Sequence, residues 1–200
     1  MYNFGERRYP PSVSAGMFMM RVITGSARGR RLETLAGDDV TRPTAESVKE
    51  ALFSMLQFEI EGKRVLDLFA GSGQMGIEAL SRGAAFCDFV ENNKRAGAVV
   101  ERNAEKCGFA GRYRLILTDA QSFAASCGKY DIVFLDPPYG KGLIGVILPV
   151  IENRLNDHAL VACETSAKEE LPENVGSLNQ IKSRRYGKTK ITLYRKDINR

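Results

Sequence analysis

Apolar residues in this chain fall into short, nearly continuous runs that are separated by longer segments with helical spacing. The apolar runs predict strands that are buried on both faces, at 64–69, 86–91, 113–118, 132–136 and 159–165. The segments between them predict helices, at 73–81, 94–107, 120–126 and 143–154. This alternation predicts an α/β fold with a doubly wound, mostly parallel, Rossmann-like sheet that is covered by helices on both faces.

The N-terminal part of the chain departs from this alternation. Residues 1–18 show no periodicity and predict a flexible leader. Residues 21–24 and 31–34 bracket a glycine-containing turn, which predicts a small β-hairpin. Thr44 is then expected to cap a helix, because apolar residues follow it at helical spacing.

The C-terminal part also has a different pattern. Residues 180–185 and 190–195 lie on either side of Gly187 and predict a hairpin that adds an antiparallel strand to the sheet. The chain is therefore expected to have three parts: a leader at 1–18, a hairpin-and-helix extension at 19–62 and a main domain at 63–200.

The composition is that of an ordinary globular protein, since 44% of the residues are apolar and 26% are charged. The four cysteines are widely spaced and His158 is the single histidine, so we expect no metal site, redox centre or histidine-based triad. No apolar run reaches the length of a membrane span, and no secretory signal is recognisable. The sequence thus predicts a cytoplasmic protein without a metal, a membrane or an obligate protein partner.

The net charge is +5, and the positions of the basic residues say more about a partner than this total does. Residues 182–196 contain seven basic residues and no acidic one, together with Tyr186, which could stack on a base. A second basic group lies near the N-terminus and comprises Arg21, Arg28, Arg30, Arg31 and Arg42. Either group alone could be a solvated surface, but two basic groups that flank one core favour contact with nucleic-acid phosphates.

A glycine-rich turn follows the first predicted strand. Gly71, Gly73 and Gly76 satisfy a G-x-G-x-x-G pattern, and Glu91 ends the next strand. Such glycines let the backbone approach a nucleotide, and an acidic residue in that place can hold a ribose diol. Taken alone, this pattern fits a dinucleotide cofactor.

Two further carboxylates favour a different cofactor. Asp67 lies four residues before Gly71, where it would repel a pyrophosphate but attract an ammonium group. Asp119 follows the third strand and could accept a hydrogen bond from an adenine amine. S-adenosylmethionine carries an ammonium, a ribose diol and an adenine, which Asp67, Glu91 and Asp119 would bind in that order.

The fourth predicted strand ends in Asp136-Pro137-Pro138-Tyr139. Neither proline can donate a backbone hydrogen bond, and both restrict the backbone, so the sequence predicts a stiff edge that presents a carboxylate, acceptor carbonyls and a ring. Such a slot suits the amine of a planar base, which is held by edge hydrogen bonds and stacking. The alternative interpretation is a proline-rich turn that only ends the strand.

These motifs carry a resemblance to known enzymes. The segment Asp67-Leu-Phe-Ala-Gly-Ser-Gly73, together with Asp136-Pro-Pro-Tyr139, resembles class I S-adenosylmethionine-dependent amino-methyltransferases. The fuller pattern covers residues 20–196 and is similar to the bacterial RsmD-type family of 16S ribosomal RNA (guanine-N2)-methyltransferases. The segments that narrow the family are Met20-Arg-Val-Ile-Thr-Gly25, Gly29-Arg-Arg-Leu32, Thr41-Arg-Pro-Thr44, Val48-Lys-Glu-Ala-Leu-Phe53 and Arg185-Tyr-Gly-Lys-Thr189.

The resemblance implies methyl transfer from S-adenosylmethionine to the N2 amine of a guanine in 16S ribosomal RNA, either naked or within the small ribosomal subunit or an assembly intermediate. It implies a catalytic set of Asp136, Pro137 and Tyr139. The implied cofactor-binding set is Asp67, Phe69, Gly71, Gly73, Glu91, Asn92, Asp119 and Ala120. The implied RNA-binding set is Arg28, Arg30, Arg31, Arg42, Arg184, Arg185, Tyr186 and Lys188.

Two other functions stay open at this point. The slot recognises an amine, so an enzyme that methylates adenine N6 in DNA or RNA would present the same residues. A nucleic-acid-binding module that has kept the fold and lost catalysis is the second alternative, although the intact slot beside an intact cofactor turn speaks against it.

Overall fold

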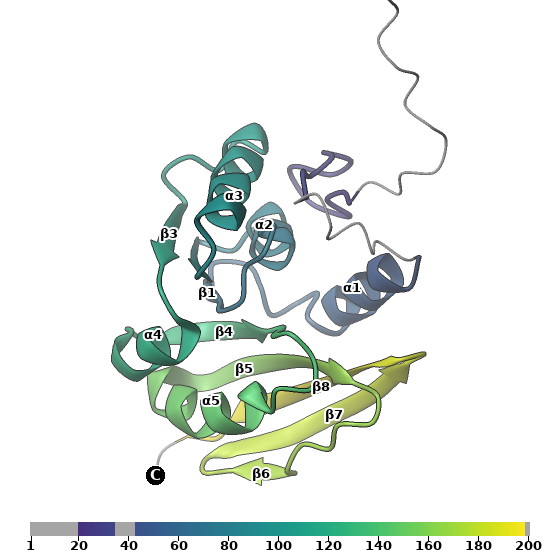
Figure 1. The fold of residues 1–200 in the computed structure, drawn as a ribbon, viewed down its shortest axis with the longest axis vertical. Helices are drawn as coiled ribbons and strands as arrows, with labels where there is room; N and C mark the ends of the chain where they lie inside the picture. The colour runs from purple at the N-terminus through teal and green to yellow at the C-terminus, as the bar shows by residue number, and fades with distance from the viewer. Residues whose placement is uncertain (1–19, 35–42, 199–200) are drawn as a thin grey trace, which may run out of the picture.

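The strands of the computed structural model, which describes residues 20–34 and 43–198, form one sheet of eight strands (Figure 1). The strand order is β3-β2-β1-β4-β5-β8-β7-β6, and the neighbours from β3 to β5 are parallel, whereas β8, β7 and β6 are antiparallel to the strands beside them. The strands are β1 (Arg64–Asp67), β2 (Phe86–Glu91), β3 (Tyr113–Leu117), β4 (Tyr130–Leu135), β5 (Leu155–Ser166), β6 (Asn174–Val175), β7 (Leu178–Tyr186) and β8 (Thr189–Lys196). The predicted α/β fold with a C-terminal antiparallel hairpin is confirmed.

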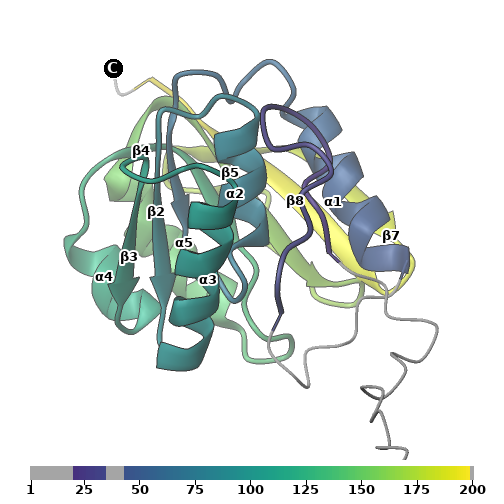
Figure 2. The ribbon, with the colours of Figure 1, turned by 90° about the horizontal axis from the view of Figure 1, so that it is seen from above.

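Helices cover both faces of the sheet, as the view in Figure 2 shows. They are α1 (Pro43–Met55), α2 (Gln74–Ser81), α3 (Lys94–Lys106), α4 (Ala120–Ser126) and α5 (Leu143–Ile151), which continues as a 3₁₀ turn at Glu152–Arg154. The buried residues form two clusters, one on each face. One cluster joins α1, α2 and α3 to the sheet, and the other joins α4 and α5 to it.

Several predicted boundaries were wrong in ways that the packing explains. Strand β5 begins at Leu155 rather than at residue 159, because its early part also pairs with β4, where the register shifts. Helix α1 begins at Pro43, so Thr44 is already its second residue and not its cap. Proline is well suited to the first helical position, because the N–H that it lacks would have no partner inside the helix. The short strand β6 carried no pattern and was not predicted.

The predicted N-terminal hairpin is present in a short form, with one antiparallel bridge between Arg21 and Arg31. Three backbone hydrogen bonds join its two sides. A side chain from a distant helix holds the hairpin against the core: the carboxylate of Glu78, in α2, accepts hydrogen bonds from the backbone N–H groups of Ile23 (2.7 Å) and Thr24 (3.0 Å). The segment is thus held both by its own hairpin hydrogen bonds and by the core.

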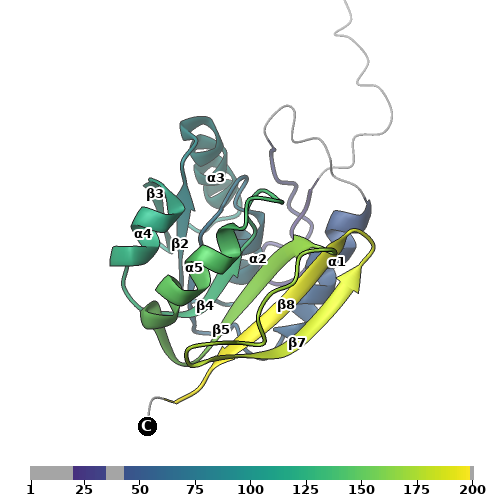
Figure 3. The ribbon, with the colours of Figure 1, turned by 60° about the horizontal axis from the view of Figure 1, so that its bottom comes forward.

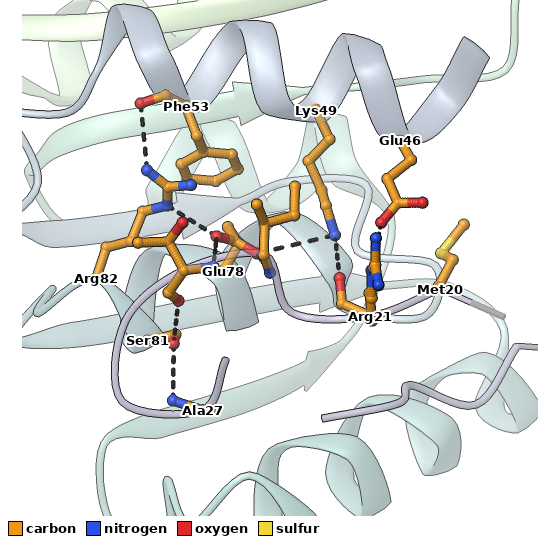
Figure 4. A network of polar contacts seen from close by, with 12 residues as sticks. Met20, Arg21, Ala27, Glu46, Lys49, Phe53, Glu78, Ser81 and Arg82 are labelled. Atoms are coloured by element: carbon orange, nitrogen blue, oxygen red, sulfur yellow. Dashed lines mark hydrogen bonds and ion pairs between the residues drawn. The ribbon is translucent and has the colours of Figure 1, made fainter. Parts of the chain in front are cut away.

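Figure 4 shows the polar network that fixes this segment against α1 and α2. Glu78 is fully buried, and it also accepts a hydrogen bond from Arg82 (2.8 Å) and lies 3.9 Å from the ammonium of Lys49. Burial lowers the pKa of Lys49, while Glu78 opposes that shift. Ser81 accepts a hydrogen bond from the N–H of Ala27 and donates one to the carbonyl of Thr24.

The extension and the main domain share one core. Val22, Ala27 and Leu32 of the N-terminal segment and Leu52 of α1 belong to the same buried cluster as residues of the sheet. Gly25 has a positive φ of 87°, and a Cβ there would come within 1.8 Å of the carbonyl oxygen of Ser81. The domain boundary at residues 62 and 63 stays a prediction, and the leader at 1–18 lies outside the described residues.

Within residues 20–34 and 43–198, no helix is long and apolar enough to cross a membrane. The cytoplasmic location inferred from the sequence stays a prediction.

We predict that Glu78→Ala destabilises the protein by about 3–5 kcal/mol, because it leaves the buried Lys49 without its counter-charge and two backbone N–H groups without an acceptor. The matched control is Glu46→Ala, which removes the exposed ion pair between Arg21 and Glu46 and should leave the free energy of unfolding nearly unchanged. Urea unfolding of the two variants and the wild type measures both values. Equal losses in the two variants would show that the buried network is not what holds the segment.

Candidate active site

A cavity of about 830 Å³ opens at the carboxyl ends of the parallel strands, near the point between β1 and β4 where the strand order reverses. Doubly wound sheets bind their ligands at this place. The wall is built by the ends of β1, β2 and β4 and by the loop between β3 and α4. It includes nine of the eleven predicted catalytic and cofactor-binding residues: Phe69, Gly71, Glu91, Asn92, Asp119, Ala120, Asp136, Pro137 and Tyr139.

The two predicted residues that do not line the cavity are Asp67 and Gly73. Asp67 is 1% exposed and lies under the glycine turn, where its Oδ2 accepts a hydrogen bond from the N–H of Gly76 at 3.0 Å. Burial raises the pKa of Asp67 to about 7, and the nearby charge of Glu91 adds to this effect. The observed position makes Asp67 a buried support of the turn, and its binding of an ammonium group stays a prediction.

The third glycine of the motif serves close packing. A Cβ on Gly76 would come within 2.3 Å of the Phe89 ring and 2.6 Å of the Cys87 sulfur. Helix α2 therefore packs against β2 at a distance that only glycine permits. This explains the third glycine of the pattern without any contact to a ligand.

Glu91 fixes the glycine turn from the end of β2. Its Oε2 accepts a hydrogen bond from the N–H of Gly71 and its Oε1 accepts one from the N–H of Asn93, both at 2.8 Å. A carboxylate can accept about four hydrogen bonds, so each oxygen keeps capacity for a ligand hydroxyl. The side chain is held in place with acceptor capacity to spare on the wall of the cavity.

A second support of the same turn comes from α3. The amide of Asn103, which is fully buried, donates hydrogen bonds to the carbonyls of Ser72 (2.9 Å) and Glu33 (3.0 Å) and accepts one from the N–H of Glu33 (2.8 Å). The glycine turn and the N-terminal segment are therefore fixed to one side chain. Sequence reasoning missed this residue.

Asp119 combines the predicted position with a structural role. It is the N-cap of α4, where its Oδ1 accepts hydrogen bonds from the N–H groups of Gln121 and Ser122, both at 3.0 Å. The carboxylate also lines the cavity, and Oδ2 takes no part in the cap. Helix capping by this residue and a contact to an adenine amine are compatible.

Asp136 differs from these carboxylates, because its oxygens form no hydrogen bond within the described part of the chain. Burial raises its pKa well above the ordinary range, and the charges of Glu164 and Asp67 raise it further. The two prolines that follow provide no N–H groups to stabilise the charge. The segment Asp136–Tyr139, here called the amine slot, therefore presents a half-buried acceptor that has no donor from the described part of the chain.

Tyr139 is fixed at the mouth of the cavity by its hydroxyl group. The hydroxyl donates a hydrogen bond to Oε1 of Glu164 (2.6 Å), in β5, and lies 3.2 Å from Oγ1 of Thr189, in β8. The residue is nevertheless 46% exposed, so its ring is accessible from solvent. Glu164 and Thr189 were missed, although a lone acidic residue in the apolar run of β5 was a usable signal.

The predicted basic cluster at 182–196 contains both buried and exposed residues in the structure. Lys190 and Lys196 are buried: Lys190 pairs with Glu170, and Lys196 donates to the carbonyls of Glu152 and Leu155. Arg195 pairs with Glu59. These residues stabilise the fold rather than form an open basic surface, which corrects the prediction for that part of the cluster.

Figure 3 shows the hairpin of β7 and β8. The predicted RNA-binding residues of the cluster lie at the end of β7 and in the turn that follows it. Arg184, Arg185 and Lys188 are exposed there, whereas Tyr186 is partly buried against the core. The pairing of Ser166 with Thr189 places this turn at the carboxyl end of β5, beside the amine slot. Arg28, Arg30 and Arg31 are exposed on the N-terminal segment, and Arg42 lies outside the described residues.

In the described ranges, no group of three or more His, Cys, Asp or Glu residues is arranged to hold a metal ion.

Comparisons with known proteins agree with this geometry. The model of a family described as "Conserved hypothetical protein 95" matches residues 20–195. The chain is 38% identical to "Putative rRNA methyltransferase YlbH" of Bacillus subtilis, over 88% of this chain and 99% of that protein. It is 33% identical to "Ribosomal RNA small subunit methyltransferase D" of Escherichia coli, over 92% and 93%. The solved structure of "Putative methyltransferase yhhF" from Escherichia coli superposes with a TM-score of 0.79 at 32% identity, covering 90% of this chain and 99% of that one.

We predict that Asp67→Asn stabilises the protein at neutral pH. Since the pKa of Asp67 is raised to about 7 in the folded state, the folded protein binds this proton more tightly than the unfolded chain does. The free energy of unfolding therefore falls as pH rises from about 4 to about 7, and an amide at this place avoids that loss. The Asn variant should melt a few degrees higher than the wild type at about pH 8 and show no advantage at about pH 4.

Thermal unfolding across this pH range measures the difference. Glu173→Gln, which removes an exposed carboxylate, is the matched control and should leave the difference near zero at every pH. A lower melting temperature of Asp67→Asn throughout the range would contradict the account, since it would mean that the ionised carboxylate stabilises the turn.

Proposed function

Because the chain belongs to the RsmD-type family of ribosomal RNA methyltransferases, as its family match and its relatives show, we propose that it methylates the exocyclic N2 amine of a guanine in small-subunit ribosomal RNA. The resemblance inferred from the sequence motifs is thereby confirmed. S-adenosylmethionine is the proposed methyl donor, and 16S ribosomal RNA or the small subunit is the proposed partner. The observation that carries the proposal is the unpaired carboxylate of Asp136 at the mouth of the cavity.

The residues of the cavity fit this donor. Three carboxylates, on Glu91, Asp119 and Asp136, line the wall, and Lys141 is the one basic residue among the lining residues described. Such a wall favours a cation and disfavours the pyrophosphate of a nicotinamide cofactor. Glu91 would hold the ribose diol and Asp119 the adenine amine. The volume is also within the usual range for a ligand site, which is about 300–1,000 Å³.

Alignment of two reactants is the main task of the proposed enzyme. When bound, S-adenosylmethionine supplies an electrophilic methyl group and keeps the electron pair of the carbon–sulfur bond that breaks. The N2 lone pair of guanine is delocalised into the ring and is therefore a weak nucleophile. Hydrogen bonds from the amine to the Asp136 carboxylate and the Pro137 carbonyl would turn the lone pair toward the methyl group.

The same two acceptors would stabilise the transition state. Positive charge develops on the amine nitrogen as its lone pair forms the new bond to carbon, and a carboxylate held beside the nitrogen stabilises such charge. The amine becomes acidic during transfer, so no strong base is required, and one of its protons leaves. Asp136, whose pKa is raised by burial, is suited to accept that proton.

The basic residues beside the slot would position the RNA. Arg184, Arg185 and Lys188 follow the phosphate backbone in this proposal, and the exposed ring of Tyr139 stacks on the base. A nucleotide that is unpaired or flipped out of its stack could reach the slot at an acceptable free-energy cost. The side chains of the N-terminal segment would extend the contact.

Adenine N6 methylation is the second candidate. The observation that supports it is the same unpaired carboxylate, since Asp136 would accept a hydrogen bond from either amine. A binding module without catalysis is less compatible with the site, because such a module would not require an acceptor slot beside a cofactor-sized cavity.

We predict that Asp136→Ala lowers the rate of methyl transfer by at least about 100-fold, because the amine loses the acceptor that aligns its lone pair. Binding of S-adenosylmethionine should survive, since Glu91 and Asp119 are unchanged. Transfer of radiolabelled methyl groups to small-subunit particles measures the rate, and a thermal-shift titration measures binding. The matched control is Asp157→Ala, an exposed carboxylate of β5 outside the cavity. Near-wild-type turnover of Asp136→Ala would disprove the mechanism.

We also predict that Arg184→Gln, Arg185→Gln and Lys188→Gln weaken RNA binding and flatten its dependence on salt. Each phosphate contact that is lost should reduce the slope of log affinity against log salt by about 0.7–0.9. Filter binding at several salt concentrations gives the slope. Lys129→Gln, at the amino end of β4 and thus at the opposite edge of the sheet, is the control that should leave it unchanged. Equal slopes for all four variants would argue against contact at the hairpin turn.

A further inference from the structure

Two carboxylates lie side by side at the amine slot. Strands β4 and β5 are parallel neighbours, and Leu135 is paired with Cys163 at the end of β4. Asp136 follows Leu135 and Glu164 follows Cys163, so the two carboxylates occupy adjacent positions at the same edge of the sheet. The spacing of neighbouring strands is about 4.8 Å, which brings the two side chains within contact distance of one planar ligand.

The pair has acceptor capacity that the protein does not use. Glu164 uses Oε1 to accept the hydrogen bond from the Tyr139 hydroxyl. No hydrogen bond to Oε2 of Glu164 or to either carboxylate oxygen of Asp136 is found among the residues that the structure describes. Burial raises the pKa of both carboxyl groups, and the charge of Glu164 adds to the shift of Asp136. Both carboxylates are partly accessible, so the donors of a ligand can reach the oxygens that the protein leaves unused.

Glu164 lies on the side of the slot away from the cofactor. The cavity wall includes Asp136 and Tyr139 but not Glu164. Glu164 is instead reached from β8, through the contact of Tyr139 with Thr189 and through its own pairing with Ile191. This is the side on which the basic hairpin turn lies, and hence the side from which a nucleotide would enter.

Guanine and adenine do not fit this pair of carboxylates equally well. Guanine presents two neighbouring donors on one edge, the N1–H group and the N2 amine. In adenine the N6 amine is flanked by N1, which is an acceptor. A pair of carboxylates can bind both donors of guanine, whereas one of the two would face a lone pair in adenine. Sites that are built to bind an N–H group reject analogues that lack it, because the buried acceptor is then left unpaired.

We propose that Glu164 is a specificity-determining residue: it accepts a hydrogen bond from N1–H of the target guanine while Asp136 accepts one from the N2 amine. This inference rests on the proposed function and adds to it a reason for the choice of guanine over adenine. A purely structural role, in which Glu164 only positions the ring of Tyr139, is the competing explanation, and the two roles predict different effects on base selectivity.

The probe that separates them is 2-aminopurine, which has the same exocyclic amine at position 2 but carries a lone pair at N1. The target guanine is first located by mapping the methyl group that the wild type transfers to small-subunit RNA. That nucleotide is then replaced by 2-aminopurine through ligation of RNA fragments, and the particles are reassembled. Values of kcat/KM for guanine and for 2-aminopurine give the selectivity.

The wild type should prefer guanine by at least about 100-fold. Glu164→Gln can still accept the Tyr139 hydrogen bond through its amide oxygen, but it replaces the second acceptor with a donor. Its selectivity should fall at least about tenfold, mainly through slower reaction of guanine. Tyr139→Phe removes the hydroxyl and leaves Glu164 intact, so it should slow both substrates and keep the wild-type selectivity.

Each contrary result has a defined meaning. Equal reaction of guanine and 2-aminopurine in the wild type would overturn the inference, and this comparison requires no variant that has to fold. Unchanged selectivity in Glu164→Gln, or an equal loss in Tyr139→Phe, would assign Glu164 to the positioning of the ring and would also overturn it. Absence of any methylated guanine with the wild type would instead overturn the proposed function itself, and the inference with it.

Discussion

The half-buried carboxylate of Asp136 receives no hydrogen bond from the described part of its own chain, and most of the proposed active site depends on that constraint. Two prolines after it remove the N–H groups that could have satisfied it, and β4 and β5 bring Glu164 beside it. A ligand with two neighbouring N–H donors would satisfy both carboxylates. A site of this kind binds an amine strongly and stabilises positive charge that develops on it.

The rest of the fold fixes the glycine turn and the turn between β7 and β8 relative to this carboxylate. On one side, Glu91 and Asn103 fix the glycine turn that borders the cavity. On the other side, Thr189 links the hairpin turn with its exposed basic residues to Tyr139. The N-terminal segment is fixed to the same body by the buried Glu78. In the proposed function, this arrangement would align the methyl donor, the target base and the phosphate backbone.

The alternation of strands and helices was predictable, because parallel strands that are buried on both faces leave a strong apolar signal. The residues at the strand ends were predictable for a related reason: the carboxyl ends of parallel strands meet at one edge, so Glu91, Asp119 and Asp136 had to converge. What the sequence could not reveal were contacts between residues far apart in the chain. Glu78 binds the backbone of the N-terminal hairpin from a distant helix, and Lys190 and Lys196 are buried and bound to residues outside the basic cluster.

Glu164 and Asp67 illustrate the same limit within the site. Glu164 becomes part of the slot only through the pairing of β5 with β4, which no local pattern encodes. Asp67 has the expected position in the strand, but its carboxylate is taken up by Gly76 beneath the turn rather than presented to the cavity. In both cases the residue type indicated a role in the site, but the direction of the side chain is set by tertiary contacts.

The central claim is that an amine held by Asp136 is methylated, and that this amine belongs to guanine. The most direct measurement is transfer of radiolabelled methyl groups from S-adenosylmethionine to small-subunit particles and to naked 16S ribosomal RNA, followed by digestion and nucleoside analysis. The account predicts that the label is recovered as N2-methylguanosine. Recovery as N6-methyladenosine would contradict the assignment of the base and the role given to Glu164, and absence of transfer to either substrate would contradict the proposed function.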